Sequence, residues 1–360
     1  MIFHRTIFFL AIVFSVEEIF STNALAESYR ADGRMTYAVR DAQGNLDVKD
    51  VFSFTIWVDD CKWFIQTSDE GRKDIKSFED SYDGKYVYAL STFIDKTGTD
   101  QSSGIIENNN IPQENSFYAS PVWLALASSC YFNDITNDMF QPIWHLSDIS
   151  IRNKRFSIVG HWTKHNASPF LPEKVSYYND GKIYYTDSGG NSRIASYASP
   201  YDKGFMEAEY IALEYTNKYE ITLPRQFTFT RYMPRPGGQS TNETMIMCLY
   251  SGVVTNISIE NKKTDYWPAL SPPVYIDDRR FGVVIPPVTS IQYMATNSWW
   301  PSMENPVVTN KYKVKAFGAN ASDFVQSSPK KPLPKLIIWG ALLCTTLFFV
   351  FLLFKGTRKN

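Results

Sequence analysis

The sequence predicts a mainly β fold: an antiparallel curved sheet or partly open barrel with one or few covering helices, followed by one C-terminal transmembrane helix. Aromatic residues make up 16% of the chain, and Tyr, Phe and Trp favour the half-buried surface of a sheet. Short apolar or alternating runs are separated by Gly, Asn and Asp, which is typical of strands joined by turns. A charge-free run of nineteen residues, 336–354, lies near the C-terminus.

The first 26 residues are predicted to form a signal peptide. Arg5 provides a basic start, residues 7–16 are largely apolar, and Ala24-Leu25-Ala26 supplies the small residues that a signal peptidase requires. The apolar run is too short to span the roughly 30 Å hydrocarbon core of a bilayer. A retained signal anchor is the alternative, because Glu17 and Glu18 lengthen the segment before the cleavage site.

The second apolar run, 336–354, is long enough to cross a bilayer as a helix. The basic tail 355–360 follows it and gives a stop-transfer pattern. With a cleaved signal peptide, residues 27–326 form an extracytoplasmic β-rich domain, with a sub-domain boundary near residue 235. Residues 327–335 form a Pro/Lys linker. We therefore expect a single-pass membrane protein with its bulk in the periplasm or on the cell surface, and a short cytoplasmic tail.

Strand patterns dominate the external part. Asp83-Gly84 and Asn179-Asp180-Gly181-Lys182 each lie between apolar runs and predict hairpins. The polar stretch 95–116 predicts a long loop or an ordered lid. Residues 264–307 are rich in Pro and Trp and give no assignment. The expected strands are 35–39, 51–58, 63–67, 86–90, 155–163, 175–178, 183–186, 208–216, 226–232, 245–250, 253–259 and 311–317.

One internal helix is expected. Ser120 can cap it, Pro121 suits the first helical position, and residues 122–131 are strongly apolar. This helix is the element that can cover one apolar face of the predicted sheet.

The order of these features resembles that of the periplasmic lipoprotein carriers of the LolA/LolB type. The matching residues are Phe54 and Trp63, the Asp83–Tyr88 hairpin segment, and Leu223–Phe227. The resemblance covers about residues 30–235 and implies an apolar concave sheet face that can hold an acyl chain. If such a groove exists, the candidates for its wall are Trp57, Trp63, Tyr86 and Tyr88. The chain is longer than those carriers and has a membrane helix, which favours docking or scaffolding over shuttling.

Charge and cysteine content limit the function further. Removing the signal peptide (net −1) and the tail (net +3) from the whole chain (net −1) leaves an external charge of −3, whereas nucleic-acid binding requires a basic surface. Cys61, Cys130 and Cys248 lie in the external part. One disulfide among them and three small buried thiols both fit this spacing.

No motif predicts a catalytic residue, a metal ion or a cofactor. His161 and His165 are four residues apart in a predicted strand, about 13 Å, which is too far for joint ligation of zinc. Asp59-Asp60 and Asp277-Asp278 are assigned to turns. Trp299-Trp300 and Trp267 are interpreted as packing residues, with a carbohydrate or lipid platform as the alternative.

Three functions are left open by the sequence. The first is a membrane-anchored binding or scaffold protein that binds a lipid or a lipoprotein acyl chain in an apolar groove. The second is a structural or adhesion domain without a cavity. The third is an envelope hydrolase with an unrecognised site. We expect a membrane as a partner, and no nucleic acid. Enzymatic activity is not the favoured interpretation.

Overall fold

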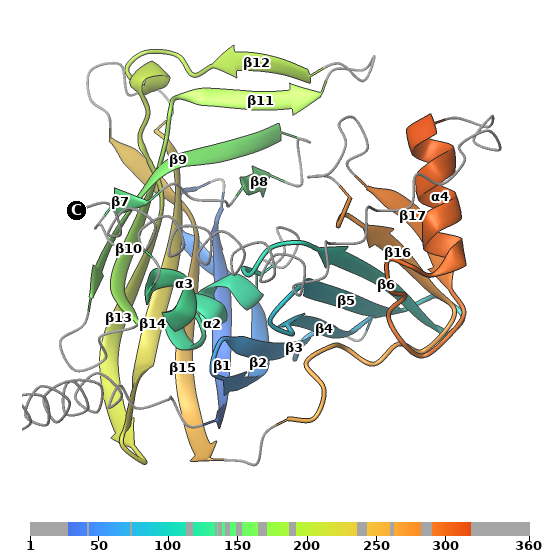
Figure 1. Ribbon diagram of the computed structural model, residues 1–360. Helices are drawn as coiled ribbons and strands as arrows, with labels where there is room; N and C mark the ends of the chain where they lie inside the picture. Colours follow the sequence, from blue (N-terminus) through green and yellow to red (C-terminus); the bar gives the residue numbers. More distant parts are fainter. Residues whose placement is uncertain are drawn as a thin grey trace, which may run out of the picture. The chain divides into compact units, whose positions relative to one another are not determined.

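The computed structural model (Figure 1) describes most of the predicted external part. The described residues are 28–41, 43–72, 74–112, 118–133, 135, 139–140, 145–148, 153–164, 171–186, 192–235, 243–259, 263–281 and 290–317. The predicted signal peptide, linker, transmembrane helix and tail lie outside them, so these assignments stay predictions, as does the boundary near residue 235. Within these ranges, no helix combines the length and hydropathy that crossing a bilayer requires.

The chain divides into two compact units, Met1–Val308 and Thr309–Asn360, and every described strand belongs to the first. The strands are β1 (Tyr29–Arg40), β2 (Leu46–Asp59), β3 (Lys62–Asp69), β4 (Ile75–Tyr82), β5 (Val87–Ile94), β6 (Asp100–Glu107), β7 (Met139–Phe140), β8 (His145–Asp148), β9 (Asn153–Lys164), β10 (Pro172–Asn179), β11 (Lys182–Thr186), β12 (Ser192–Ser196), β13 (Met206–Lys218), β14 (Ile221–Pro234), β15 (Thr244–Ile259), β16 (Val274–Asp278) and β17 (Ile291–Ala295). The helices are α2 (Ala119–Leu126), α3 (Ser129–Asn133), the short 3-10 helix η1 (Tyr201–Lys203) and α4 (Pro306–Phe317).

The strands form one extended, curved sheet in which β1 is central (Figure 1). On one side of β1, an antiparallel meander runs through β2, β3, β4, β5 and β6. On its other side, β15, β14, β13, β10 and β9 follow, also antiparallel. Beyond β6 lie β16, which pairs in parallel with β6, and β17. The predicted mainly β, antiparallel curved sheet is confirmed, with β6–β16 as a parallel exception.

Alternation of apolar residues explains the local structure. In β2, Phe52, Phe54, Ile56 and Val58 are all buried, whereas the residues between them are partly exposed. Because successive side chains in a strand point to opposite faces, these four lie on one face of the sheet. The same face receives the buried Phe227 and Phe229 of β14. We call this face, which α2 covers, the inner face.

The inner face carries the main hydrophobic core. All eight residues of α2 are buried, and this helix contacts β2, β3, β13, β14 and β15. The predicted helix over 121–131 is broken, because α2 ends at Leu126 and α3 begins at Ser129. Ser120 is not the N-cap residue that the sequence predicted, because α2 begins at Ala119. The N-cap residue is Tyr118, whose side chain makes no capping hydrogen bond.

The outer face has a second apolar cluster at the other end of the sheet. Its members come from β5, β6, β16, β17 and the segment before β16, and all are buried: Tyr88, Leu90, Ile106, Tyr266, Leu270, Val274, Ile276, Ile291 and Tyr293. The unassigned segment 264–307 therefore supplies two strands and an apolar cover for the sheet.

Three segments of the chain have a secondary structure that differs from the one predicted. The run 95–116 contains β6, a polar strand stabilised by neighbours on both sides. Residues 245–250 and 253–259 belong to one strand, β15. Residues 311–317 are helical, since Pro306 begins α4 and the Asn305 side chain accepts a hydrogen bond from the Val307 amide at 2.9 Å.

The two predicted hairpins have different outcomes. At Asp83-Gly84, β4 and β5 pair directly, and the Asp83 carboxylate accepts hydrogen bonds from the amides of Lys85 and Tyr86. At residues 179–182 the chain also turns, but β10 pairs with β9 and β13 and β11 pairs with β9 and β12. The second turn therefore does not form a hairpin.

Candidate functional site

The structure does not bring the four predicted wall residues together. Trp63 is fully buried in the inner-face core. Trp57 lies on the outer face, since it is one residue away from the inward-facing Ile56 and Val58. Tyr86 and Tyr88 also lie toward the outer face, near β16 and Trp300. Whether any of them binds a ligand stays a prediction.

Trp57 and its neighbours form a cation–aromatic cluster on the outer face. The Trp57 ring is 5.6 Å from that of Phe64. The Lys263 ammonium lies 4.8 Å from the Trp57 ring and 4.2 Å from the Phe64 ring, and the Arg30 guanidinium lies 5.1 Å from Trp57. Burial lowers the pKa of Lys263. This cluster fixes the start of the segment that leads to β16.

Tyr86 lies beside a buried ion pair of Asp278 and Arg280, whereas the Tyr88 hydroxyl donates a hydrogen bond to the Asp83 carboxylate at 2.9 Å. The Asp278 carboxylate accepts hydrogen bonds from Arg280 Nε at 2.9 Å and Nη2 at 2.5 Å, and from the Tyr293 hydroxyl at 3.0 Å. The Arg280 guanidinium lies 5.3 Å from the Tyr86 ring. Burial alone lowers the pKa of Arg280, but the hydrogen bonds and charge of Asp278 outweigh it and raise the pKa. The Asp278 carboxylate also accepts a hydrogen bond from the Arg280 backbone amide at 3.2 Å, so Asp278 combines the predicted turn role with a buried ion pair.

The inner face carries a continuous row of aromatic rings beside the start of α2. We call it the aromatic strip: Tyr37, Phe52, Phe78, Phe93, Tyr118 and Tyr250. Tyr118 is its hub, with ring centroids 4.0 Å from Phe52, 5.5 Å from Phe78, and 6.4 Å from Tyr37 and Tyr250. The strip continues from Phe78 to Phe93 at 5.9 Å.

Exposure rises along the strip. Phe52 and Tyr250 are buried, Tyr37, Phe78 and Tyr118 are intermediate, and the Phe93 residue is 38% exposed. The described side chains beneath α2 are buried, whereas Phe93 on this flank of the inner face is exposed. Among the described residues, the strip is therefore an apolar surface of the inner face that a ligand can reach.

Charged groups border the strip at its tyrosine end. Burial raises the pKa of Tyr37 to about 12, while the nearby Arg231 guanidinium acts in the opposite direction. Burial likewise raises the pKa of Tyr118 to about 12. The pKa of Asp50 is raised by burial and by the charge of Asp69. An apolar surface with cationic and anionic groups at one end suits an amphipathic molecule.

The aromatic strip was not predicted from the sequence. The expected strand 86–90 ended before Phe93, although the alternation of Val87, Ala89 and Ser91 continues to that residue. Extending the alternation places Phe93 on the inner face. The position of Tyr118 depends on the packing of α2 and has no comparable signal in the sequence.

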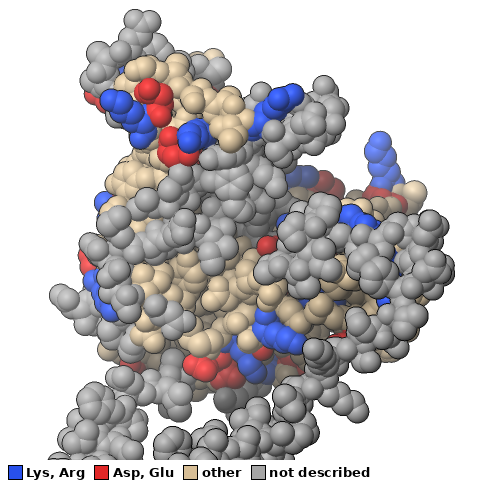
Figure 2. Space-filling model, turned by 45° about the horizontal axis from the view of Figure 1, so that its top comes forward, with Lys and Arg blue, Asp and Glu red and all other residues tan. Residues whose placement is uncertain are grey.

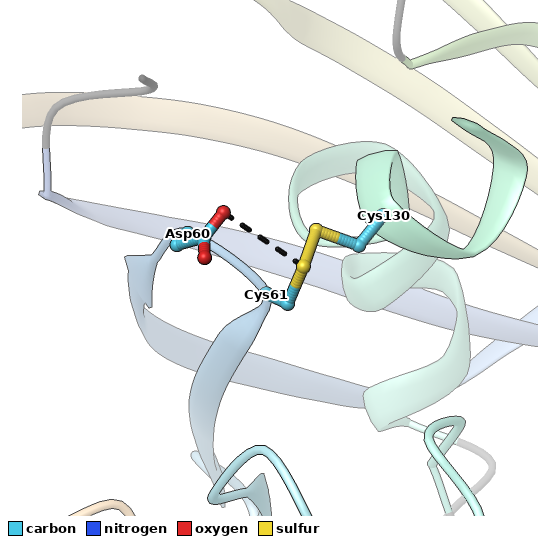
Figure 3. A group of neighbouring side chains, drawn as sticks. All are labelled: Asp60, Cys61 and Cys130. Atoms are coloured by element: carbon cyan, nitrogen blue, oxygen red, sulfur yellow. Dashed lines mark hydrogen bonds between the residues drawn. A yellow bond between two sulfur atoms is a disulfide. The ribbon is translucent and has the colours of Figure 1, made fainter. Parts of the chain in front are cut away.

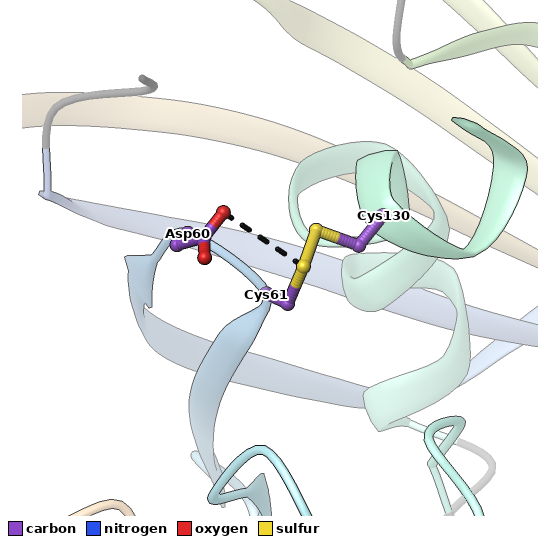
Figure 4. Close-up of a disulfide and its surroundings, with 3 residues drawn as sticks. All are labelled: Asp60, Cys61 and Cys130. Carbon is purple, nitrogen blue, oxygen red and sulfur yellow. Dashed lines mark hydrogen bonds between the residues drawn. A yellow bond between two sulfur atoms is a disulfide. The ribbon is translucent and has the colours of Figure 1, made fainter. Parts of the chain in front are cut away.

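The described cysteines are accounted for by one disulfide and one thiol. Cys61 and Cys130 form a disulfide, and Cys248 is a buried cysteine outside it. One carboxylate oxygen of Asp60 and the two sulfurs lie within 4.8 Å of one another (Figure 3). Asp60 Oδ1 is 3.8 Å from Cys61 Sγ (Figure 4). Because the sulfurs are joined, neither offers a thiolate to a metal ion in this state.

Two further surface features are less specific. A shallow cavity of about 220 Å³ lies along the ends of β13, β14 and β15, lined by Thr216, Lys218, Arg225, Val254, Thr255, Asn256 and Ile257. His161 is exposed on β9, opposite Ser176, and His165 lies outside the described residues. Figure 2 shows acidic and basic side chains intermingled on the face in view.

Comparisons with known proteins add a weak structural likeness. No protein-family model and no curated protein matches the chain. It is similar to a DUF1329 family protein from Desulfovibrio piger ATCC 29098, with a TM-score of 0.31 and 9% identity over 67% of this chain and 89% of that one. It is also matched to MucB in complex with MucA(peri), with a TM-score of 0.10 and 8% identity over 66% and 95% of the two chains. Neither TM-score supports an argument about function.

Proposed function

We propose that this chain is a membrane-anchored extracytoplasmic binding protein that holds a lipid or a lipoprotein acyl chain on the aromatic strip. The observation that supports the proposal is the exposed flank of the inner face, where rings from five strands and Tyr118 form one apolar surface. An acyl chain on this surface removes apolar area from water, at roughly 25 cal/mol per Å². The membrane anchor is the predicted helix 336–354.

The proposed ligand lies beside α2 rather than under it. The eight buried residues of α2 occupy the centre of the inner face, where the sequence analysis expected the groove. The bound chain would therefore extend from Tyr37 across Tyr118 and Phe78 to Phe93, following the ring contacts. The polar end of the ligand would face the charged groups near Tyr37.

Native mass spectrometry of the detergent-extracted full chain tests this proposal. We expect one co-purified lipid or acyl chain per protein. Phe93→Ser should lower its occupancy at least about threefold, because it removes the exposed end of the strip. Ile194→Ser is the matched control: Ile194 is 63% exposed in β12, outside the strip, and its substitution should leave the occupancy unchanged. An absent lipid, or equal occupancy in both variants, contradicts the proposal.

A structural or adhesion domain is the second candidate, and one observation favours it. Among the described residues, large side chains are fully buried in the inner-face core, among them Trp63, Phe132 and Phe227. A solid sheet-and-helix module needs no ligand. Under that alternative, the aromatic strip serves only to pack Tyr118 and the start of α2, and Phe93→Ser changes neither lipid content nor any binding.

A further inference from the structure

The segment before β16 presents its side chains alternately to the sheet and to solvent. Tyr266, Pro268 and Leu270 are buried, whereas Trp267 and Ala269 are exposed. Because Tyr266 and Leu270 belong to the outer-face cluster, the exposed residues that alternate with them point away from the sheet. Trp267 is 43% exposed, which is a large apolar area on a single residue.

A second segment meets the first at Trp300. The Trp300 indole Nε1 donates a hydrogen bond to the carbonyl oxygen of Pro268 at 2.8 Å. The Trp300 ring lies 5.1 Å from the Tyr88 ring. A Cβ added to Gly104 would lie 2.7 Å from the Trp300 ring. Gly104 therefore allows Trp300 to pack directly on β6. The neighbouring Trp299 is 58% exposed.

This contact gathers uncharged exposed residues on one surface. We call it the tryptophan ridge: Trp267, Ala269, Pro272, Pro273 and Trp299, all of which are exposed or nearly so. Its two segments, 267–273 and 296–299, contain no charged residue. The hydrogen bond from Trp300 and the buried residues between the exposed ones hold the ridge in place, so that little ordering is needed before it binds.

The chemistry of the ridge matches a membrane–water interface. Indole has an apolar body and one N–H donor, and tryptophan is enriched at the level of the lipid headgroups for that reason. Segments without Lys or Arg gain little from anionic lipids. The ridge should therefore bind zwitterionic phospholipid as well as anionic phospholipid.

The length of the chain beyond α4 supports a membrane as the binding partner of the ridge. Eighteen residues, 318–335, separate the end of α4 from the predicted membrane helix, and they span at most about 65 Å. The domain is thus confined near the bilayer, where a short tether gives an effective concentration in the mM range. Weak insertion of two indoles is then enough for substantial occupancy.

We infer that the tryptophan ridge docks the external domain onto the surface of the membrane in which the chain is anchored, with Trp267 and Trp299 in the headgroup region. The inference rests on the membrane-anchored topology of the proposed function, and it is independent of ligand binding on the aromatic strip. Docking limits the orientations of the domain relative to the bilayer.

Quenching of tryptophan fluorescence by brominated lipids tests the inference. The full chain, with Trp339→Phe to remove the indole of the predicted anchor, is placed in nanodiscs of phosphatidylcholine brominated near the glycerol. We expect strong quenching that falls at least twofold in Trp267→Phe/Trp299→Phe. Replacing part of the lipid with phosphatidylglycerol should not change this result.

Two controls separate the possible failures. Tyr219→Ser removes a 51% exposed aromatic side chain at the β13–β14 turn and should leave the quenching unchanged. Circular dichroism checks that each variant is folded. Equal quenching with and without the two indoles overturns the inference and leaves the ridge to a protein or carbohydrate partner. Failure of the chain to enter nanodiscs overturns the anchored topology itself, whereas lipid occupancy of the strip is measured separately.

Discussion

Cys61 and Cys130 are joined by a disulfide that fastens the β2–β3 turn to α3 across a sequence separation of 69 residues. The enclosed chain contains β3 to β6 and α2. Two residues beyond Cys130, Phe132 is fully buried in the inner-face core, with its ring 4.9 Å from that of Trp162. The disulfide therefore holds the helical cover against the sheet at a place where no strand pairing can do so.

Removing the disulfide should destabilise the fold considerably. For a loop of this length, the chain-entropy model predicts that Cys61→Ser/Cys130→Ser lowers the free energy of unfolding by about 4 kcal/mol. Urea unfolding of the full chain in detergent measures the change. Wild type treated with a dithiol reductant should match the variant, and the reductant should not alter the variant. Equal stability in all four samples would show that α3 is held by packing alone.

The pairing of these cysteines could not be read from the sequence. Cys61, Cys130 and Cys248 lie far apart along the chain, and the packing of α3 against the β2–β3 turn makes Cys130 the partner of Cys61. Cys248 is on β15, buried within the sheet. Spacing alone fits several pairings, because disulfide connectivity depends on tertiary contacts.

Strands could be predicted where alternating apolar residues bury one face of the strand. They could not be predicted where a polar strand is held by hydrogen bonds to its neighbours. The expected strand 226–232 is part of β14, in which the alternating residues Phe227, Phe229 and Arg231 are buried. In contrast, β6 is polar and depends on hydrogen bonds to β5 and β16. A lone strand sequence carries no information about such neighbours.

The aromatic character of the candidate site could be predicted from the sequence, but its residues could not. Aromatic residues on strands were expected to form an apolar wall, and the aromatic strip has that character. The chosen residues fell on two faces, however, because Trp57 and Trp63 are on opposite sides of the sheet. A β-turn joins their strands, and the register across it decides which face each side chain takes.

On the outer face, the buried Asp278–Arg280 ion pair and the partly exposed Asp277–Arg279 pair should contribute differently to stability. Asp278→Asn should lower the free energy of unfolding by about 3–5 kcal/mol, because it leaves the buried Arg280 charge uncompensated. Asp277→Asn, one residue away, removes a partly exposed pair with Arg279 and should cost no more than about 1 kcal/mol. Urea unfolding of both variants measures the difference. Equal effects would mean that the Asp278–Arg280 pair is hydrated in solution.

A glycine under an aromatic ring makes the inner-face core sensitive to one methyl group. A Cβ on Gly252 would lie 2.2 Å from the Phe227 ring, and the two residues are paired across β15 and β14. Gly252→Ala should therefore destabilise the fold by about 1–3 kcal/mol through overpacking. In the double variant with Phe227→Leu, the cost of the alanine should largely disappear. A double-mutant cycle that shows simple additivity would contradict the direct contact.

The tyrosines of the aromatic strip predict a loss of stability at alkaline pH. Burial raises the pKa of Tyr37 and of Tyr118 to about 12 in the folded chain, whereas an unfolded tyrosine ionises near about 10. Between these values the unfolded chain releases protons that the folded chain retains, so the free energy of unfolding falls as pH rises from 10 to 12. Tyr37→Phe and Tyr118→Phe should each make this fall shallower, as measured by urea unfolding at a series of pH values. Phe52→Leu is the matched control for this prediction. It removes a ring that contacts Tyr118 but removes no ionisable group, so it should lower the free energy of unfolding by the same amount at every pH. A slope that both tyrosine variants leave unchanged would show that their hydroxyls are solvated, and that the strip is more open than its burial indicates.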